Sequence, residues 1–299
     1  MEQELVSIVM SIYNESEEEL IKSIDSVLSQ TYENIELIIV NDNPVRDVNQ
    51  KVLAGINNAK VKIHNNEKNI GLVKSLNTAL SLASGSYIAR MDADDISRND
   101  RIEKQLAYLK NGGFDLIGSW IELINERDET IGEMTFPISC KCVDKTLKYG
   151  GCVAHPSWLA KREVYDTLKG YRLVPHCEDY DFLNRALING FKLGNIPEKC
   201  LKYRLRETSV SVTNKTQQLV LRRYLSKNRA RLDQISEEDI TRYLSSDEFN
   251  KKLNRLMKYE DTKKGLRNKN ILCAFKLIFS SEFYIYLVEK NVPKLYMNK

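Results

Sequence analysis

Glycine and proline are scarce in this chain, which has 13 glycines and 6 prolines among 299 residues. With 42% hydrophobic and 29% charged residues, this composition excludes a fibrous or disordered chain and is typical of a folded globular protein. The sequence also has no internal repeat and no low-complexity segment. Its length fits one large α/β domain or two smaller ones.

A long hydrophobic run is also missing. The most apolar late stretch, residues 271–288, is interrupted by Lys276 and Glu282 and falls short of the roughly 20 apolar residues that a membrane-spanning helix needs. At the start, Glu2 and Glu4 stand where a secretory leader would have a basic segment and an apolar core. We therefore expect no transmembrane helix and a cytoplasmic location.

Two glycine-rich nucleotide-binding motifs are absent. The sequence has no Gly-x-x-x-x-Gly-Lys-Ser/Thr loop, which excludes a P-loop nucleotide hydrolase. It has no Gly-x-Gly-x-x-Gly after its first predicted strand, which disfavours a dinucleotide cofactor.

The six cysteines do not form the paired Cys-x-x-Cys spacing of a zinc site. A zinc site could still be drawn from Cys140, Cys142 and Cys152 with His155 or His176 and Cys177. The favoured interpretation is reduced thiols in the core or partly exposed, as expected of a cytoplasmic chain.

Net charge is small, with 45 lysines and arginines against 41 acidic residues, so its sign alone does not argue for nucleic-acid binding. The distribution is uneven: residues 251–299 hold 12 basic and 4 acidic residues, a local +8, which leaves −4 for the first 250. We expect a basic helical region over residues 215–299. It could rest on an anionic membrane surface or pack on the preceding domain with its basic face in solvent. Its apolar residues are Ile271, Leu272, Phe275, Leu277, Ile278, Phe279, Phe283, Tyr284, Tyr286 and Leu287.

Short β-branched runs alternate with helical patterns over the first hundred residues. Residues 6–12 and 35–40 are typical of strands buried on both faces of a parallel sheet, and further strands are predicted at residues 60–64 and 86–91. The alternation predicts a doubly wound α/β sheet, whose ligands bind at the carboxyl ends of the strands.

The predicted helices have recognisable ends. Asn14 and Ser16 can cap a helix that runs to about residue 28, and Gly85 is suited to end a helix over residues 72–83. Further along, a mixed or antiparallel hairpin is expected from residues 116–125 with residues 130–136.

Polar clusters follow three of the predicted strands, at residues 11–15, 41–43 and 92–95. In the last one, Asp92, Asp94 and Asp95 would repel one another unless a cation lay between them, and Mg²⁺ or Mn²⁺ prefers carboxylates with phosphate oxygens. The cluster predicts a metal that bridges the protein to a diphosphate, and Asp42 offers a carboxylate to a base edge. The alternative is a solvated turn in which Asp95 caps a helix that starts near residues 97–100.

These motifs together resemble family 2 of the inverting glycosyltransferases. The resemblance spans roughly residues 5–210, with motifs at residues 6–15, 26–32, 38–42, 69–71, 89–95, 155–156, 177–182 and 196–198. It implies a GT-A fold, a mostly parallel Rossmann-like sheet flanked by helices. The domain would cover residues 1–214, with a nucleotide-sugar half over 1–98 and an acceptor and catalytic half over 99–214. The sequence around Asp92 is similar to that of enzymes that build bacterial O-antigen, capsule and exopolysaccharide.

The resemblance places Tyr13 and Asp42 at the nucleobase, Asp92 near the ribose and the metal, and Asp94 as a direct ligand of Mn²⁺ or Mg²⁺. Leu76 stands where the family often has an arginine, and Lys74 is a possible substitute. Ser11 replaces a common proline and Asn41 a common aspartate, and neither change removes a group that the mechanism requires. The expected nucleotide-sugar residues are Ser11, Tyr13, Glu15, Asp42, Lys74, Asp92, Ala93 and Asp94.

On the acceptor side, the resemblance makes Asp179 the catalytic base, and Glu178 beside it would raise its proton affinity. Asp181 is either part of the site or only a helix-start carboxylate. His155, Trp158 and Tyr180 would shape the acceptor pocket, or they are buried packing residues.

The function implied is transfer of a hexose, with galactose or glucose and a β-1,3 linkage as guesses, from a UDP-sugar to a glycan on polyprenyl diphosphate. Three alternatives stay open. A sugar nucleotidyltransferase would open with a glycine-rich loop, a non-catalytic binding protein would not need both Asp94 and Asp179, and nucleic-acid binding, which we do not expect, would depend steeply on salt.

Overall fold

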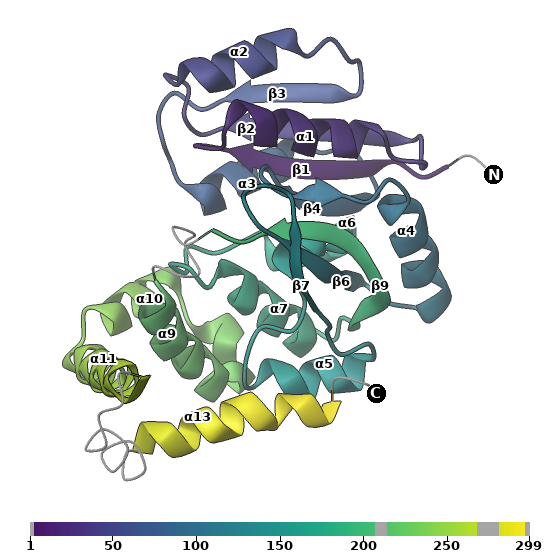
Figure 1. Ribbon diagram of the computed structural model, residues 1–299. Helices are drawn as coiled ribbons and strands as arrows, with labels where there is room; N and C mark the ends of the chain where they lie inside the picture. The colour runs from purple at the N-terminus through teal and green to yellow at the C-terminus, as the bar shows by residue number, and fades with distance from the viewer. Residues whose placement is uncertain (1–2, 207–213, 268–280, 297–299) are drawn as a thin grey trace.

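The protein is described by a computed structural model over residues 3–206, 214–267 and 281–296 (Figure 1). Its strands form one nine-stranded sheet in the order β3-β2-β1-β4-β8-β6-β9-β5, with β7 paired to β6. The strands are β1 (Val6–Ile12), β2 (Ile35–Asn41), β3 (Val61–Asn65), β4 (Tyr87–Asp92), β5 (Ile96–Ser97), β6 (Leu116–Ile124), β7 (Thr130–Met134), β8 (Leu159–Lys161) and β9 (Leu193–Arg204).

The first four strands are parallel neighbours, which confirms the predicted doubly wound half. Beyond β4 the sheet is mixed: β8 runs antiparallel to β4 and β6, while β6 and β9 are parallel. The predicted hairpin is confirmed as β6 and β7. The architecture is therefore the mixed α/β, mostly parallel sheet that the sequence predicted.

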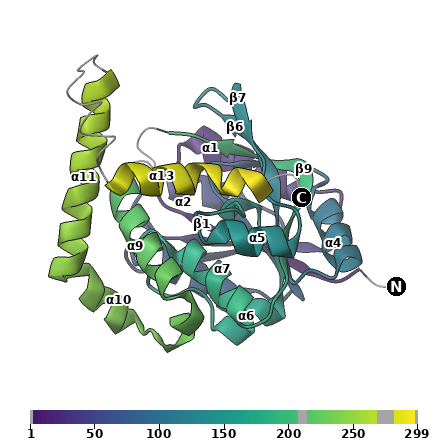
Figure 2. The ribbon, with the colours of Figure 1, turned by 90° about the horizontal axis from the view of Figure 1, so that it is seen from below.

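Helices cover both faces of this sheet (Figures 1 and 2). They are α1 (Glu17–Leu28), α2 (Asp47–Gly55), α3 (Leu72–Leu82), α4 (Arg101–Gly112), α5 (Cys140–Leu147), α6 (Arg162–Leu168), α7 (Glu178–Ile188), α9 (Lys215–Lys227), α10 (Glu237–Leu244), α11 (Asp247–Arg267) and α13 (Ser281–Asn291), with 3₁₀ turns η1 (His155–Ser157), η2 (Arg229–Gln234) and η3 (Pro293–Tyr296). One core lies between the sheet and α1, α2 and α4, and the other between the sheet and α3, α5, α6, α7 and the C-terminal helices.

Alternation along β4 decides which of its side chains face each of the two cores. Tyr87, Ala89 and Met91 enter the core of α1 and α4, whereas Ile88 enters the core of α3 and α7. Successive residues of a strand point to opposite faces, so Arg90 and Asp92 lie on the side of α3 and α7.

Both predicted helix ends can be compared with the structure. Ser16 caps α1: its Oγ accepts a hydrogen bond from the Glu19 amide at 3.3 Å, and the Glu19 carboxylate accepts one from the Ser16 amide at 2.9 Å. The prediction for Gly85 is wrong, because α3 ends at Leu82 with Ala83 as its cap. Gly85 is needed for close packing instead, since a Cβ there would lie 2.6 Å from the Leu5 carbonyl oxygen.

The described residues after 214 are mainly helical, as predicted. Helices α9, α10 and α11 add apolar side chains to the core of α3 and α7, so this region packs on the domain (Figure 2). The predicted apolar residues 271–279 lie outside the described residues. Within the described ranges, no helix is both long enough and apolar enough to cross a membrane.

Candidate active site

The three polar clusters meet at one edge of the sheet. In the strand register, Ser11 lies between Val40 of β2 and Asp92 of β4, and Ile12 is opposite Asn41. The parallel strands thus bring together side chains that are more than 80 positions apart in the chain. This meeting at the carboxyl ends of the strands is what the sequence predicted.

Asp42 is buried and organises a loop. Its carboxylate accepts hydrogen bonds from the Asn66 side-chain amide at 2.8 Å and from the backbone amides of Ile70 at 2.8 Å and Gly71 at 2.9 Å. Gly71 has a φ of 87°, a left-handed conformation that favours glycine. The carboxylate therefore holds the 69–71 loop at the strand end. The ring of Tyr13 at the same edge is 46% exposed and free for a planar partner.

Asp94 is flanked by one cation and several acids. Its Oδ2 lies 3.2 Å from Nη2 of Arg206, which is also 2.9 Å from the Glu19 carboxylate. Burial, followed by the charge of Asp92, raises the pKa of Asp94 to about 7, and Arg206 opposes that rise. Sequence reasoning missed Arg206, which follows β9 and carries no motif of its own.

Glu15 adds another acid to this group. Its Oε2 accepts a hydrogen bond from the Tyr13 amide at 2.8 Å, and burial raises its pKa, with Asp92 adding to the rise. Ala93, between the two aspartates, is buried. Lys74 lies in the first turn of α3 and is exposed.

Asp95 is structural. It is buried, and its Oδ1 accepts a hydrogen bond from the Arg204 amide at 2.8 Å. Helix α4 begins at Arg101 after Asp100, so the alternative in which Asp95 caps that helix is wrong. Its Oδ2 finds no hydrogen-bond partner among the described residues.

The donor set of this cluster fits a hard divalent cation. Burial is the largest cause of a raised pKa at Glu15, Asp94 and Asp95, and the charge of Asp92 adds to the rise at all three. Within the described ranges, no three His, Cys, Asp or Glu side chains are arranged to hold a metal ion. Asp92 and Asp94 would therefore supply two ligands, leaving the others to phosphate oxygens and water, as is common for Mg²⁺ and Mn²⁺.

The second acidic pair begins α7. The Asp179 Oδ1 accepts a hydrogen bond from the Tyr180 amide at 2.6 Å, and the preceding His176 has a φ of 59°, which is uncommon for a residue with a side chain. Burial raises the pKa of Asp179, while that hydrogen bond and Arg90 oppose the rise. Burial, followed by Asp179, raises the pKa of Glu178 to about 7. A carboxylate with a raised pKa is a stronger proton acceptor once ionised.

Arg90 lies between the two acidic groups. Its side chain is 3% exposed and forms an ion pair with Asp92, and its charge also acts on Glu178 and Asp179. Its Nε and Nη1 find no hydrogen-bond partner among the described residues. Sequence reasoning did not assign this residue a role. The available signal was period-two alternation, which puts Arg90 on the same face of β4 as Asp92.

His155, Trp158 and Tyr180, the candidate residues of the acceptor pocket, are buried. Trp158 is fully buried, and Tyr180 donates a hydrogen bond to the Leu147 carbonyl at 2.6 Å. Nε2 of His155 lies 2.8 Å from the Tyr171 hydroxyl, and burial, with the charge of Arg90, holds the His155 pKa well below its usual value. These contacts favour the packing interpretation that the sequence left open.

Asp181 is a carboxylate in the first turn of α7 that pairs with two arginines. Its Oδ2 accepts hydrogen bonds from Arg172 at 3.0 Å and Arg185 at 2.8 Å, and the carboxylate is fully buried. Asn77, beside the position of the missing family arginine, exchanges two hydrogen bonds with the Tyr171 backbone. Both residues hold the segment that precedes Asp179.

The cysteines do not support a zinc site. Cys142, Cys152 and Cys177 are buried, Cys140 is partly exposed, and none of them is in a disulfide. Burial raises the pKa of the Cys152 and Cys177 thiols, which disfavours the thiolate that binds zinc.

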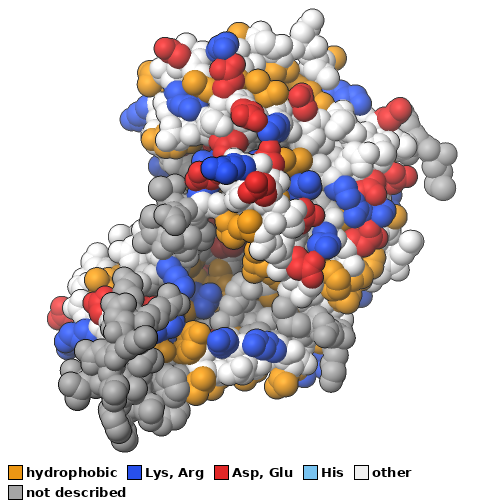
Figure 3. Space-filling view, viewed as in Figure 1, with side chains coloured by type: hydrophobic (Ala, Val, Ile, Leu, Met, Phe, Trp, Pro, Cys, Tyr) orange, Lys and Arg blue, Asp and Glu red, His pale blue; other side chains and the backbone are white. Residues whose placement is uncertain are grey.

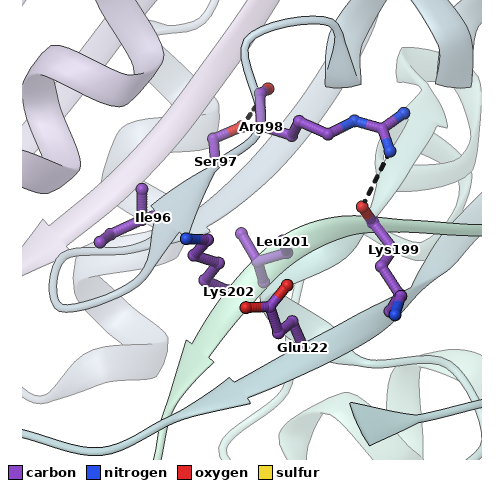
Figure 4. A pocket seen from close by; sticks show the side chains of 7 residues that line it. All are labelled: Ile96, Ser97, Arg98, Glu122, Lys199, Leu201 and Lys202. Atoms are coloured by element: carbon purple, nitrogen blue, oxygen red, sulfur yellow. Dashed lines mark hydrogen bonds between the residues drawn. The ribbon is translucent and has the colours of Figure 1, made fainter. Parts of the chain in front are cut away.

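The surface is hollowed between the sheet and the C-terminal helices, with basic and apolar side chains at its margin (Figure 3). A separate small pocket of about 90 Å³ lies between β5, β6 and β9 and is lined by Ile96, Ser97, Arg98, Glu122, Lys199, Leu201 and Lys202 (Figure 4). None of the predicted site residues lines this pocket, so it is not the site.

A family model described as glycosyl transferase family 2 matches residues 7–177. The chain belongs to this family and is a glycosyltransferase. The match covers the sheet edge with Asp42, Asp92 and Asp94, and it ends at Cys177, directly before the acidic pair.

Curated relatives agree with this assignment. The O-antigen biosynthesis glycosyltransferase WbnJ of Escherichia coli is 33% identical over 248 residues, which are 81% of this chain and 93% of that protein. The Escherichia coli enzyme named UDP-Glc:alpha-D-GlcNAc-diphosphoundecaprenol beta-1,3-glucosyltransferase WfgD is 32% identical over 220 residues, covering 73% of this chain and 84% of the relative.

Among solved structures, S. aureus TarS in complex with UDP-GlcNAc superposes with a TM-score of 0.60 at 18% identity, covering 80% of this chain and 72% of TarS. That similarity supports the fold. The predicted family and GT-A-like fold are therefore confirmed.

Proposed function

We propose that this glycosyltransferase carries out a metal-dependent, inverting transfer of a hexose from a UDP-sugar to a glycan on a lipid diphosphate, in bacterial surface polysaccharide synthesis. The observation that carries the proposal is the pair of acidic groups, Asp92 with Asp94 and Glu178 with Asp179, on either side of Arg90. One group suits a cation and a diphosphate, and the other suits removal of a proton.

In this mechanism, Asp179 accepts the proton of the acceptor hydroxyl as that oxygen attacks the anomeric carbon. The attack comes from the face opposite the leaving diphosphate, so an α-linked donor gives a β-linked product. Asp92 and Asp94 would hold Mn²⁺ or Mg²⁺, whose charge stabilises the diphosphate as it leaves. Tyr13 and the loop held by Asp42 would bind the nucleobase.

Donor and acceptor are proposed from the relatives. The name of WfgD specifies transfer from UDP-glucose to an N-acetylglucosamine on diphosphoundecaprenol, and that of WbnJ specifies O-antigen biosynthesis. We propose glucose or galactose as the sugar and a β-1,3 linkage as the product.

The test is acceptor-dependent release of UDP from UDP-glucose or UDP-galactose, with Mn²⁺ and a synthetic N-acetylglucosamine diphosphate lipid, and with the linkage read by NMR. Asp179→Asn should lose about 10²–10⁴-fold in turnover yet bind UDP normally. Asp94→Asn should lose the Mn²⁺ dependence of UDP binding. Asp166→Asn, an exposed aspartate of α6, is the control. Near-normal transfer by either site variant would refute the proposal.

The same assay separates the alternatives. A non-catalytic binding protein would bind UDP-sugar but release no UDP on addition of acceptor, and a nucleotidyltransferase would release inorganic pyrophosphate from UTP and a sugar phosphate.

A contact with the cytoplasmic face of an anionic membrane is a second part of the proposal, carried by α13. Its acidic residues Glu282 and Glu289 point inward and pair with Arg223, while Leu287 and Val288, which lie off that face, are exposed. An outward apolar face is typical of an interfacial helix. Sedimentation with anionic vesicles should fall when Leu287 and Val288 are replaced by serine, and unchanged binding would contradict this contact.

A further inference from the structure

Helix α9 contacts the segment that carries Glu178 and Asp179, although it is outside the matched residues 7–177. Cys177 Sγ contacts the Gln218 carbonyl oxygen at 3.5 Å, and the Ser226 hydroxyl donates to the Lys148 carbonyl at 2.9 Å. Helix α9 is therefore attached at Gln218 to Cys177, which precedes Glu178, and at Ser226 to Lys148 at the end of α5. Arg222 lies midway between them, four residues from each, and therefore on the same face.

Arg222 is half-buried beside a glycine turn. A Cβ added to Gly150 would lie 3.6 Å from Nη1 of Arg222, an ordinary van der Waals contact, so the guanidinium lies beside Gly150. It is also close enough to Asp179 to be among the charges that oppose the rise in the pKa of that carboxyl. The guanidinium is thus beside Gly150 and within electrostatic reach of Asp179.

Arg222 differs from its basic neighbours in its pairing. Its neighbour Arg223 pairs with Glu282 and Glu289, and Arg229 on the following turn pairs with Asp144. Arg222, in contrast, forms no ion pair with any other residue that the structure describes. A partly desolvated guanidinium is stabilised by an anion that accepts its hydrogen bonds, and its planar fork matches the oxygens of a phosphate.

The position of Arg222 indicates which substrate would supply that anion. The donor diphosphate belongs with Asp92 and Asp94 at the end of β4, whereas Asp179 meets the acceptor hydroxyl. A cation beside Asp179 but on α9 faces the acceptor. Because a phosphate on the anomeric carbon of an acceptor sugar is one ring away from the attacking hydroxyl, it could reach a cation near the base.

We propose that Arg222 binds a phosphate group of the acceptor, so that the C-terminal helices complete the acceptor site. This inference rests on the proposed transferase function and specifies how its lipid-diphosphate acceptor is recognised. It also gives the region after residue 214 a role in specificity besides any contact with a membrane.

The experiment compares two synthetic acceptors with the full-length enzyme, UDP-glucose or UDP-galactose and Mn²⁺. One is undecyl N-acetylglucosamine diphosphate, and the other is an undecyl N-acetylglucosaminide without phosphate. We expect the wild type to favour the diphosphate in kcat/KM, and Arg222→Gln to lose about 10–100-fold on the diphosphate only, as for loss of a charge-assisted hydrogen bond. Arg222→Lys should recover part of this loss. Arg242→Gln, an exposed arginine of α10, is the control.

Binding separates this inference from the proposed function. With UDP and Mn²⁺ saturating, calorimetry should show weaker binding of the diphosphate probe to Arg222→Gln and unchanged binding of UDP. Equal losses on both acceptors, or a weaker affinity for UDP, would overturn the role of Arg222 in acceptor binding. If the wild type binds the diphosphate probe through Arg222 but transfers no sugar to it, the inference stands and the proposed reaction is wrong. If the wild type does not bind the probe, the inference is wrong.

Discussion

Replacement of Glu178 by glutamine should stabilise the protein at high pH, because burial and Asp179 raise the pKa of Glu178 from 4.5 to about 7. The folded state then holds a proton that the unfolded state releases between pH 4.5 and 7, so the stability of the wild type falls as pH rises through that range. Above pH 7 the cost of ionising Glu178 in the folded state is about 3 kcal/mol. Glutamine resembles the protonated side chain and avoids this cost.

Urea unfolding followed by tryptophan fluorescence, at pH 5 and pH 8, measures the difference. Glu178→Gln should gain about 3 kcal/mol at pH 8 and less than about 1 kcal/mol at pH 5. The control is Glu163→Gln, which removes an exposed glutamate of α6. If Glu178→Gln is equally stabilised at both pH values, or destabilised at pH 8, the account of crowded charge at this site is wrong.

Two further substitutions test the scaffold of the site. Asp181→Asn removes the partner of two arginines, Arg172 and Arg185, around a fully buried carboxylate, and should cost about 3–5 kcal/mol in unfolding free energy by urea titration; a loss below 1 kcal/mol would contradict a structural role. Asp42→Asn deprives the Gly71 and neighbouring amides of a charged acceptor, and should weaken UDP binding about tenfold by calorimetry while the Mn²⁺ dependence persists. Unchanged UDP affinity would show that the 69–71 loop does not contribute to the nucleotide site.

The half of the fold that carries Asp42, Asp92 and Asp94 could be predicted from the sequence because its signals are local. β1 matches its predicted bounds, and the other three parallel strands match to within a residue at each end, since β-branched runs bounded by polar clusters specify buried parallel strands. Once those strands are parallel, the meeting of Asp42 and Asp92 at one edge follows from topology.

The other half of the site depends on contacts between distant segments, which carry no spacing signal. Arg206 reaches Asp94 from the end of β9, more than 100 residues away, and Arg222 reaches the base segment from α9. Gly85 shows the same limit, since a glycine after a helical pattern predicts a cap, but here the close approach of β1 requires it. Sequence periodicity identifies the face of an element and does not identify the partner across it.

Arg90 illustrates why the residue type at such a contact is constrained even when its partner cannot be predicted. It is buried, and its charge acts on Glu178 and Asp179, whose pKa values burial raises, so the cation there must stay charged while these two neighbours titrate. A lysine readily loses its proton when buried, whereas a guanidinium does not. The Arg90 guanidinium has more hydrogen-bond donors than its pair with Asp92 uses. Its Nε and Nη1 find no partner among the described residues. An unmet donor in the interior is costly. The electrostatics of the two acidic groups therefore account for an arginine in the middle of a buried strand, where apolar periodicity alone would predict valine or isoleucine.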